Sequence, residues 1–442
     1  MCEKTWLAKE FRWLYTKNTM ESRIISLVVF IGAYLFFIFL HKKKAQTALI
    51  SSALLILTGA ISVKQAFFSI NWNVMGIFVG TLLVADIFMQ SRMPAYIAEV
   101  IVAKSRNVAS AILWICLLAG FISAFVENVA TLLIVAPIAI SLARKLKINP
   151  MNMMIAIAVS SNLQGAATLI GDPPSMLLAG FARMNFMDFF FYQGRPSIFF
   201  AVELGALASF VVLYFVFRKH KQRTALIAVE KVKSWIPTVM LVLLILALAI
   251  SSFIDTGFSY MAGIICMVFA GISVLWNRLA YKNRFSKIIS ALDWETTLFL
   301  AGIFILVGSI TVTGWIGIIA DFLSGLVGAN IFMGYTLLVF VAVIFSAVID
   351  NVPFLAAMLP VAISMSGRLG INPSLFLFGL LIGASLGGNI TPIGASANIV
   401  ACGLLRKEGV RVNFGDFAKI GVPFTLAAVS VSYLFIWFVW RN

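Results

Sequence analysis

Residues 127–150 have the sequence ENVATLLIVAPIAISLARKLKINP, and residues 350–373 have the sequence DNVPFLAAMLPVAISMSGRLGINP. The two stretches align without a gap, because each residue of the first has its counterpart 223 positions later. Extending the alignment over 127–171 gives 16 identical residues in 45 positions. So close a match predicts that the chain consists of two homologous halves.

The repeat continues on both sides of these stretches. Downstream, SNLQGAATLIGDPPS (161–175) matches ASLGGNITPIGASAN (384–398), and upstream NWNVMGIFVG (71–80) matches DWETTLFLAG (293–302) more weakly. Internal repeats with paired, interrupted apolar segments are the best sequence indication of a secondary transporter.

Composition places the chain in a membrane. Of its 442 residues, 62% are hydrophobic and 11% are charged, whereas an average soluble domain has about 25% charged residues. The mean hydropathy is +1.03. Too few polar side chains are present to cover a soluble protein of this size, which excludes a soluble enzyme, a nucleic-acid-binding domain and a disordered chain. The sequence therefore predicts an all-α membrane protein.

Apolar segments recur along the whole chain. A spanning helix needs about 20 mostly apolar residues, and we predict about eleven to twelve of them. Segments 151–182 and 374–405 are apolar but interrupted, while 127–142 and 350–366 begin with an acidic residue and suit re-entrant hairpins. Each half is thus predicted to hold one hairpin and one broken helix. The continuous candidates are 24–40, 46–63, 73–90, 107–126, 197–217, 235–252, 258–276, 296–313, 330–349 and 420–440.

Positive charge is concentrated outside these segments. Lys plus Arg number 33 against 17 Asp plus Glu, a formal net charge of +16. The linker 218–234 is too basic to cross the membrane easily, so we place it in the cytoplasm. It separates a first half at 24–217 from a second half at 235–442, and an amphipathic segment at 1–23 is predicted to lie on the cytoplasmic surface. The excess charge indicates membrane topology and contact with anionic lipid, with no nucleic-acid partner.

Each interrupted segment contains a break rich in glycine and proline, at 164–174 and at 387–394. Backbone polar groups cannot stay unsatisfied in hydrocarbon, so such a break must be buried in protein or line a wet cavity. Free carbonyls at one half-helix end suit a cation such as Na⁺, and free amides at the other suit an anion. Gly165 and Gly388 permit close approach of a ligand. Ordinary kinked helices packed on small residues are the alternative.

An acidic residue followed by asparagine opens each predicted hairpin, as Glu127-Asn128 and Asp350-Asn351. A carboxylate at membrane depth costs at least about 2.5 kcal/mol, which makes Glu127 and Asp350 candidates for cation binding or proton transfer. The amides of Asn128 and Asn351 offer donors and an acceptor to a substrate. The alternative is that these residues only cap the helices that follow.

Further polar side chains lie near the breaks. Asp172 has Ala395 as its counterpart, and this one-sided charge is either a coupling contact or a helix cap. Asp86 and Glu203 lie in apolar segments without repeat partners and are weaker candidates. The hydroxyl and amide candidates, which are either ligands or simple interhelical hydrogen-bonders, are Ser161, Asn162, Thr168, Ser385, Asn389, Thr391, Ser396 and Asn398.

The acidic-Asn-Val hairpin starts, together with GAATLIGDPPS and GGNITPIGASAN, resemble the ion-transporter superfamily. This group includes arsenite permeases, NhaD-type sodium/proton antiporters, the melanosomal P protein, citrate–metal transporters and divalent anion–sodium symporters. The combination of GDPP and DNVP is most similar to the arsenite-permease and P-protein branch. Glu127-Asn128-Val129 and Asp350-Asn351-Val352 replace the Ser-Asn-Thr tips of the dicarboxylate symporters, which argues against a dicarboxylate substrate.

The resemblance implies a scaffold domain and a mobile transport domain in a homodimer that works by an elevator-like motion. An arsenite-permease-like member also implies a cytoplasmic ATPase as partner. Carried over by position, the predicted substrate contacts are Asn128, Asn351, Thr168, Thr391, Asn389, Gly165 and Gly388. With Asp172 added from the residues themselves, the predicted ion-coupling group is Glu127, Asp350, Asp172, Ser161, Asn162 and Ser385. Na⁺ is predicted to bind at Ser161, Asn162, Ser385 and Asn389.

We therefore predict a cell-membrane secondary transporter, not an enzyme, that couples a small anion or oxyacid to Na⁺ or H⁺ without another cofactor. Arsenite or antimonite efflux is the first substrate hypothesis, Na⁺/H⁺ exchange the second and an organic anion the third. An ion channel is the alternative of another class, although broken helices in both halves favour alternating access.

Overall fold

A computed structural model describes residues 20–39, 43–146, 148–222, 231–290, 292–328 and 330–441. Nearly all regular structure in these ranges is helical, as the composition predicts. The first half contains α2 (Met20–Phe39), α3 (Lys44–Leu57), α4 (Val63–Ser69), α5 (Trp72–Gln90), α6 (Met93–Lys104), α7 (Val108–Ser123), α8 (Asn128–Leu146), α9 (Met151–Gly165), α10 (Pro173–Ala182) and α11 (Ile198–Phe217). Between α10 and α11 lie η3 (Met187–Phe189) and a small antiparallel hairpin of β1 (Phe191–Tyr192) and β2 (Arg195–Pro196).

The second half has a matching series of helices. It contains α12 (Ile236–Ser251), α13 (Met261–Tyr281), α14 (Phe285–Ser290), α15 (Trp294–Val312), α16 (Trp315–Val327), α17 (Ile331–Ser346), α18 (Asn351–Leu369), α19 (Ser374–Gly387), η4 (Gly388–Ile390), α20 (Ser396–Lys407) and α21 (Phe414–Trp440). α18, α19 and α20 begin 223 residues after α8, α9 and α10, so the sequence repeat becomes a repeat of helices.

Length and hydropathy decide which of these helices can cross a bilayer. Among the described residues, eight helices qualify, or nine if the bent pair α16–α17 counts as one span. Four shorter apolar helices add to them, namely α3, α7, α12 and the α19 segment that runs from Ser374 to Ile390. The fold class is therefore confirmed as an all-α membrane protein, and the total of eleven to twelve crossings remains a prediction.

The helices that follow the two acidic residues are longer than the sequence predicts. α8 and α18 each have 19 residues, against the expected stretches 127–142 and 350–366. Pro137 and Pro360 lie inside them and do not end them, because a proline deletes only one backbone donor and kinks a helix more often than it stops it. Both helices are long enough to span, so their re-entrant course remains a prediction.

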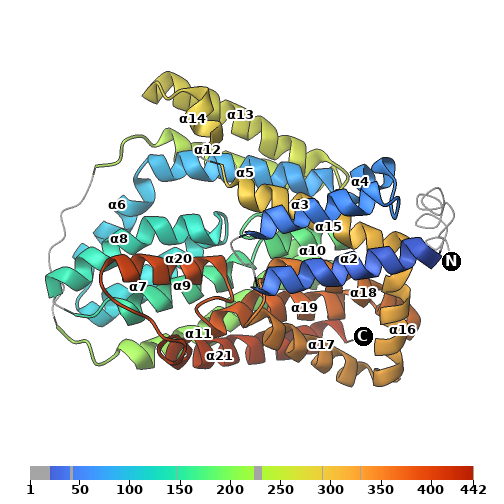
Figure 1. Ribbon diagram of the computed structural model, residues 1–442. Coiled ribbons are helices and arrows are strands. Elements are labelled where there is room, and N and C mark those ends of the chain that lie inside the picture. Colours follow the sequence, from blue (N-terminus) through green and yellow to red (C-terminus); the bar gives the residue numbers. More distant parts are fainter. Residues whose placement is uncertain are drawn as a thin grey trace.

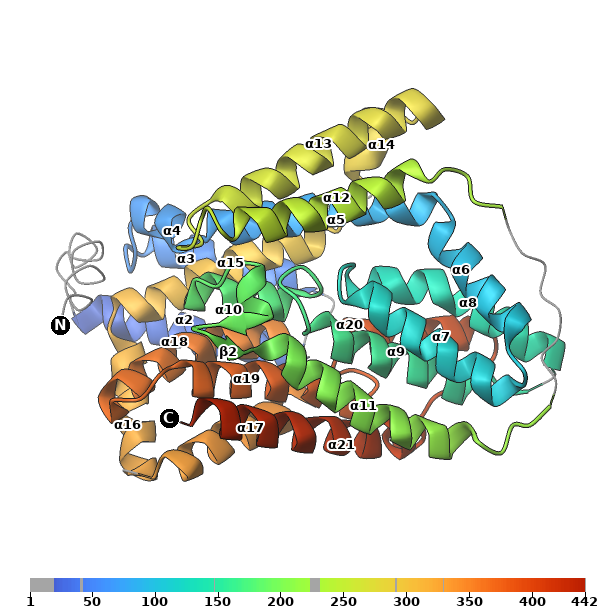
Figure 2. The ribbon, with the colours of Figure 1, turned by 180° about the vertical axis from the view of Figure 1, so that it is seen from behind.

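The two halves interlock at the centre of the molecule. Figure 1 shows α9, α10, α19 and α20 between a layer that includes α5, α12 and α13 and a layer that includes α11, α17 and α21. Figure 2 shows the same order from behind. α10 of the first half packs on α18, and α20 of the second half packs on α8. The breaks of both halves are thereby brought to one place.

Small residues allow the close crossing of α5 and α13. Gly76 and Gly80 of α5 lie against Gly263 and Cys266 of α13, and a Cβ on Gly80 would stand 2.5 Å from the Cys266 carbonyl carbon. Membrane helices associate through such contacts, since lipid gives no hydrophobic drive between them. α15 of the second half packs on α3 of the first half through Gly302. Two pairs of helices, α5 with α13 and α3 with α15, therefore connect the two halves.

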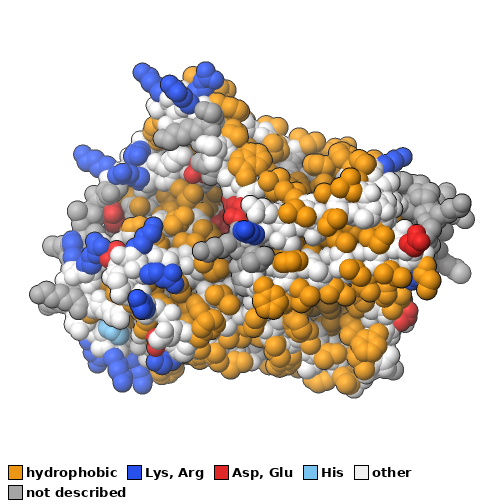
Figure 3. Space-filling view, viewed as in Figure 1, with side chains coloured by type: hydrophobic (Ala, Val, Ile, Leu, Met, Phe, Trp, Pro, Cys, Tyr) orange, Lys and Arg blue, Asp and Glu red, His pale blue; other side chains and the backbone are white. Residues whose placement is uncertain are grey.

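Charge is distributed unevenly over the surface. Figure 3 shows Lys and Arg gathered at the end that carries α6 and α8 and at the free end of α13 and α14, while hydrophobic side chains cover most of the remaining face. This distribution fits a bundle whose basic end faces the cytoplasm.

Two sequence-predicted segments fall partly outside the described residues. The surface segment 1–23 is described only from residue 20, where 20–23 form the first turn of α2. The linker 218–234 is described only at 218–222 and 231–234. The division into two halves and a linker therefore stays a prediction at these boundaries.

The crossing of α5 and α13 can be tested by adding one methyl group. We expect Gly80→Ala to lower the free energy of unfolding by about 1–3 kcal/mol, because the new Cβ must push the helices apart. Gly271→Ala on α13 is the matched control, since a Cβ there meets nothing within 4 Å. Thermal unfolding in detergent measures both, and equal melting temperatures of the two variants would contradict the packing described.

Candidate functional site

One break in helical structure separates α9 from α10, and a second, which begins with η4, separates α19 from α20. The two breaks have the same internal packing. A Cβ on Gly171 would overlap the Gly165 carbonyl oxygen, and a Cβ on Gly394 would lie 2.6 Å from that of Gly388. Gly171, Gly388 and Gly394 are thus required by close backbone contact, whereas a Cβ on Gly165 would overlap the Asn128 side chain.

The carbonyl groups freed at the breaks are bonded from equivalent positions. Ser175 Oγ donates to Gly165 O at 3.4 Å, and Asn398 Nδ2 donates to Gly388 O at 2.9 Å. Ser175 and Asn398 are related by the offset of 223. A bilayer interior leaves no backbone carbonyl unpaired without a large penalty, and these two side chains remove that penalty.

Each break contains one threonine whose hydroxyl group donates to the turn that precedes the neighbouring helix. Thr168 Oγ1 donates to Ala124 O, and Thr391 Oγ1 donates to Ala347 O at 2.5 Å. Both were predicted as substrate contacts. Their hydroxyl hydrogens are used inside the protein, so a substrate role rests on their remaining acceptor capacity.

Asn162 joins the breaks of the two halves. Its Nδ2 donates to Asn389 Oδ1 at 2.9 Å and to Asn398 Oδ1 at 2.8 Å. Its Oδ1 accepts a longer bond of 3.4 Å from Asn128 Nδ2. Asn162, Asn389 and Asn398 are buried, and the three bonds between halves and helices position their amides precisely in the protein interior.

Serine hydroxyls complete the cluster on the side of the first half. Ser123 Oγ donates to Asn128 Oδ1 at 2.7 Å, and Ser161 Oγ donates to Ser123 Oγ at 2.9 Å and to Asn128 O at 3.3 Å. We call Asn128, Asn162, Asn389, Asn398, Ser123 and Ser161 the asparagine network. It brings together five residues that the sequence marks as candidates, and it adds Ser123, which the sequence could have indicated because Ser346 is its repeat counterpart.

Ser385 and Asn351 are among the predicted residues that lie outside this network. Ser385, the counterpart of Asn162, is buried, and its Oγ has no hydrogen-bond partner among the described residues. Asn351 is half-buried at the start of α18, and no bond to the network is seen for it in the described part of the chain. The two halves therefore contribute unequally to the cluster.

Both hairpin acids cap the helices that follow them. Glu127 Oε2 accepts from the amides of Val129 and Ala130 at 2.9 and 3.1 Å, and Asp350 Oδ1 accepts from the amide of Val352 at 3.2 Å. Both carboxylates thus form the capping bonds that the sequence predicts, while an ion-binding role stays a prediction. A cap and an ion-binding role are compatible, because each carboxylate keeps a second oxygen and sits at the positive end of a helix dipole.

Asp350 also forms an ion pair that the sequence did not reveal. Lys44 Nζ lies 2.9 Å from Asp350 Oδ2 and 5.1 Å from the centre of the Phe299 ring. Asp293 and Glu295 at the start of α15 are near enough to act on Lys44 electrostatically. Figure 3 shows acidic and basic side chains meeting near the middle of an otherwise largely apolar face.

The ion pair lines a small cavity of about 40 Å³. Its wall includes Lys44, Asp350, Ala395 and Ser396. In the sequence Lys44 is the last residue of the basic run HKKK at 41–44, and its partner lies 306 residues away. No local pattern marks a charge that acquires its partner only through folding.

Asp172 caps α10, with Oδ1 accepting from the Ser175 amide at 3.0 Å. Its other oxygen, Oδ2, is buried and has no partner among the described residues. Glu127 is near enough for an electrostatic interaction with Asp172. At the equivalent position, Ala395 has the same extended backbone and no side-chain acceptor, so the unpaired carboxylate oxygen belongs to the first half alone.

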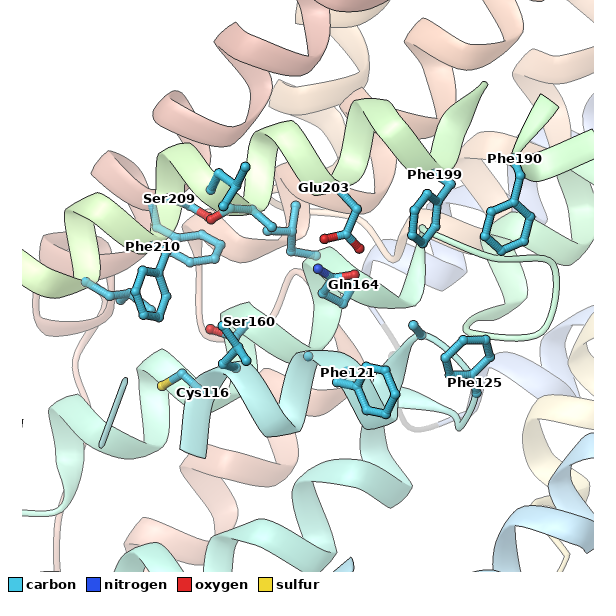
Figure 4. Close-up of a pocket in the computed structure, with 18 residues that line it drawn as sticks. Cys116, Phe121, Phe125, Ser160, Gln164, Phe190, Phe199, Glu203, Ser209 and Phe210 are labelled. Carbon is cyan, nitrogen blue, oxygen red and sulfur yellow. The ribbon is translucent and has the colours of Figure 1, made fainter. Parts of the chain in front are cut away.

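The two weaker candidates differ in their surroundings. Asp86 accepts from Gln90 Nε2 at 2.8 Å within α5. Glu203 of α11 faces Gln164 of α9 across a separate cavity (Figure 4). Neither lies in the asparagine network.

Known proteins resemble this chain over most of its length. The family model described as citrate transporter matches residues 34–370 and 355–442. An uncharacterized transporter of Mycobacterium tuberculosis is 28% identical over 425 residues, covering 94% of this chain and 98% of the relative. The P protein of Homo sapiens is 24% identical over 507 residues, covering 96% of this chain and 60% of the relative. The crystal structure of the YdaH transporter of Alcanivorax borkumensis shares the fold, with a TM-score of 0.58 at 16% identity over 84% of this chain and 85% of that one.

The contribution of Asn162 to the asparagine network can be tested by a substitution. We expect Asn162→Asp to lower the free energy of unfolding by about 2–3 kcal/mol or more. The variant loses the two hydrogen bonds that Asn162 Nδ2 donates, and it places a carboxylate oxygen against the side-chain oxygens of Asn389 and Asn398, which repel it. Asn330→Asp is the control, since Asn330 is an exposed cap that only accepts, from the Met333 amide at 3.0 Å. Thermal unfolding of both variants checks this, and the network is misassigned if Asn162→Asp is as stable as Asn330→Asp.

Proposed function

The chain belongs to the citrate transporter family, and from that premise we propose that it moves a small oxyacid anion across the cell membrane together with Na⁺ or H⁺. The family and the relatives make it a multi-pass membrane secondary transporter and not an enzyme, and they confirm the resemblance to the ion-transporter superfamily. Substrate, coupling ion and mechanism are the proposal.

The observation that carries the proposal is the bond from Asn162 to Asn389 and Asn398. It places the breaks of both halves at one buried point, where amide donors and acceptors are concentrated. Amide groups suit a small oxyacid, because N–H groups bind its oxygens and carbonyl oxygens bind its hydroxyl groups or an accompanying cation. Alternating access around a site between repeats is the mode of action that such an arrangement favours.

Lys44 suggests how a cation is coupled to an anion. Its ammonium occupies, beside Asp350, the position that a coupling cation would take. We propose that Na⁺ or a proton neutralises Asp350 and releases Lys44, whose charge then attracts the anion. Since α3 belongs to the first half of the chain and α18 to the second, the exchange would also free α18 for an elevator-like displacement.

The chemistry of the amide cluster indicates only the class of the substrate, a small oxyacid anion. The family's description names citrate, which supports an organic anion, and arsenite or antimonite remains a candidate on the motif resemblance. Na⁺/H⁺ exchange is the second function, supported by the partly buried Asp350 and by the unpaired Asp172 oxygen. Assembly as a homodimer and a cytoplasmic ATPase partner belong to the same proposal.

Asp350 and Lys44 provide the test of coupling. We expect Asp350→Asn to abolish transport in proteoliposomes, because a neutral amide neither binds Na⁺ strongly nor carries a proton. The variant also leaves Lys44 without its partner, which lowers the free energy of unfolding. For a fully buried pair this loss is about 3–5 kcal/mol, so we expect a smaller loss for this partly buried pair.

The double variant Lys44→Gln with Asp350→Asn separates these two effects. It removes both charges, so it should regain most of the melting temperature while transport stays absent. Normal transport by folded Asp350→Asn would remove Asp350 from the mechanism.

A substrate panel decides between the candidate functions. Proteoliposomes should accumulate citrate, or another small oxyacid such as arsenite, with saturable kinetics that require a Na⁺ or pH gradient. A pH-sensitive dye inside the vesicles reports Na⁺/H⁺ exchange without an added anion, which would support the second function instead. Flux that rises linearly with concentration would indicate a channel and contradict both.

A further inference from the structure

A second cavity, separate from the asparagine network, lies between α7, α9 and α11 and has a volume of about 490 Å³. Figure 4 shows its wall, with Glu203 and Gln164 facing one another at the centre and phenylalanine rings on both sides of them. A cavity of this size accepts an organic molecule rather than a bare ion. Nothing in the transport proposal above uses it.

The polar part of the wall carries unmet hydrogen-bonding capacity. The Gln164 amide serves as hydrogen-bond donor to the Glu203 carboxylate. Its own carbonyl oxygen Oε1 is buried and accepts no hydrogen bond from the described residues. Two acceptor groups, a carboxylate and an amide oxygen, therefore stand side by side with a single donor between them. A ligand that completes this pair must donate hydrogen bonds.

The charge of the wall is negative and uncompensated. Among the described residues that line the cavity, Glu203 is the only carboxylate, and Lys, Arg and His are absent. A carboxylate in an apolar setting within a membrane requires a cationic or donor partner. The faces of nearby aromatic rings also attract cations. The rings of this wall are Phe121, Phe125, Phe190, Phe199, Phe210 and Phe424.

The entrance of the cavity is apolar. Leu117, Phe121 and Leu207 line it and are 49%, 66% and 65% exposed on the outside of the helix bundle. In a membrane protein such side chains face hydrocarbon. A ligand that enters here therefore needs an apolar body in addition to a positive, hydrogen-donating group.

We propose that this cavity binds a lipophilic amine, with the ammonium group between Glu203 and Gln164 and the apolar body among the phenylalanine rings. The ammonium donates to the carboxylate and to the unpaired amide oxygen at once. The bound molecule touches Gln164, the neighbour of Gly165, and Ala124, whose carbonyl accepts from Thr168. The site thus adjoins the first break.

The test compares three probes of equal length on the full chain in nanodiscs of phosphatidylcholine. The probes are 4-phenylbutylamine, the neutral 4-phenylbutan-1-ol and the anion 4-phenylbutanoate, and calorimetric titration of empty nanodiscs corrects for partition into lipid. We expect saturable binding of the amine at least about tenfold tighter than that of the alcohol, and no saturable binding of the anion.

Matched variants locate the site. Glu203→Gln should weaken amine binding by about tenfold or more, whereas Asp86→Asn, which removes a carboxylate from α5 away from this cavity, should leave it unchanged. Leu207→Trp narrows the entrance at an exposed position, so it should also weaken binding even if Glu203→Gln folds poorly.

Three results would overturn the proposal. Equal affinity for amine and alcohol would show a groove filled by hydrocarbon alone. Unchanged amine binding by folded Glu203→Gln would show that the Glu203 carboxylate does not bind the amine. Unchanged binding by Leu207→Trp would show that the amine binds outside this cavity. The readout is binding and not transport, so failure here is independent of the proposed function.

Discussion

The structure depends on one constraint, which is that a backbone polar group inside a bilayer must be bonded within the protein. Breaking α9 and α19 exposes carbonyl groups that a continuous helix would pair. The chain satisfies them with the same devices in both halves: a side chain at 175 or 398 bonds the carbonyl at the break, and a threonine ties the break to the preceding turn. The glycines follow from this arrangement, because only they allow the backbone of the break to fold against itself.

Function is expected where the two halves differ within this shared backbone. Asn162 has Ser385 as its counterpart, and Asp172 has Ala395. Lys44 pairs with Asp350, whereas Glu127 has the acidic neighbours Asp293 and Asp172. The halves therefore provide one scaffold and two electrostatic environments, one holding a fixed cation and one left acidic. The proposed roles of Asp350 and Lys44 in coupling rest on this difference.

The helix starts around the two breaks could be predicted from the sequence, because the two halves of the repeat can be aligned with each other. An offset of 223 predicts where α18, α19 and α20 begin, and the acidic-Asn pairs predict helix starts with capping carboxylates. The helix lengths of α8 and α18 were underestimated, since a central proline in a membrane helix is tolerated more readily than in water. Lys44 and the Asn162–Asn398 contact could not be predicted, because each joins residues more than 200 positions apart through the packing of one half on the other.

The central claim is that the buried amides around Asn162 form the transport site. The most direct measurement is saturable, gradient-driven uptake of the best substrate by Asn162→Ser, which places in the first half the residue that the second half already buries at 385. The account predicts a protein that stays folded, because serine is tolerated at the equivalent buried position, and that has lost saturable uptake. Uptake with unchanged affinity and rate in this variant would contradict it.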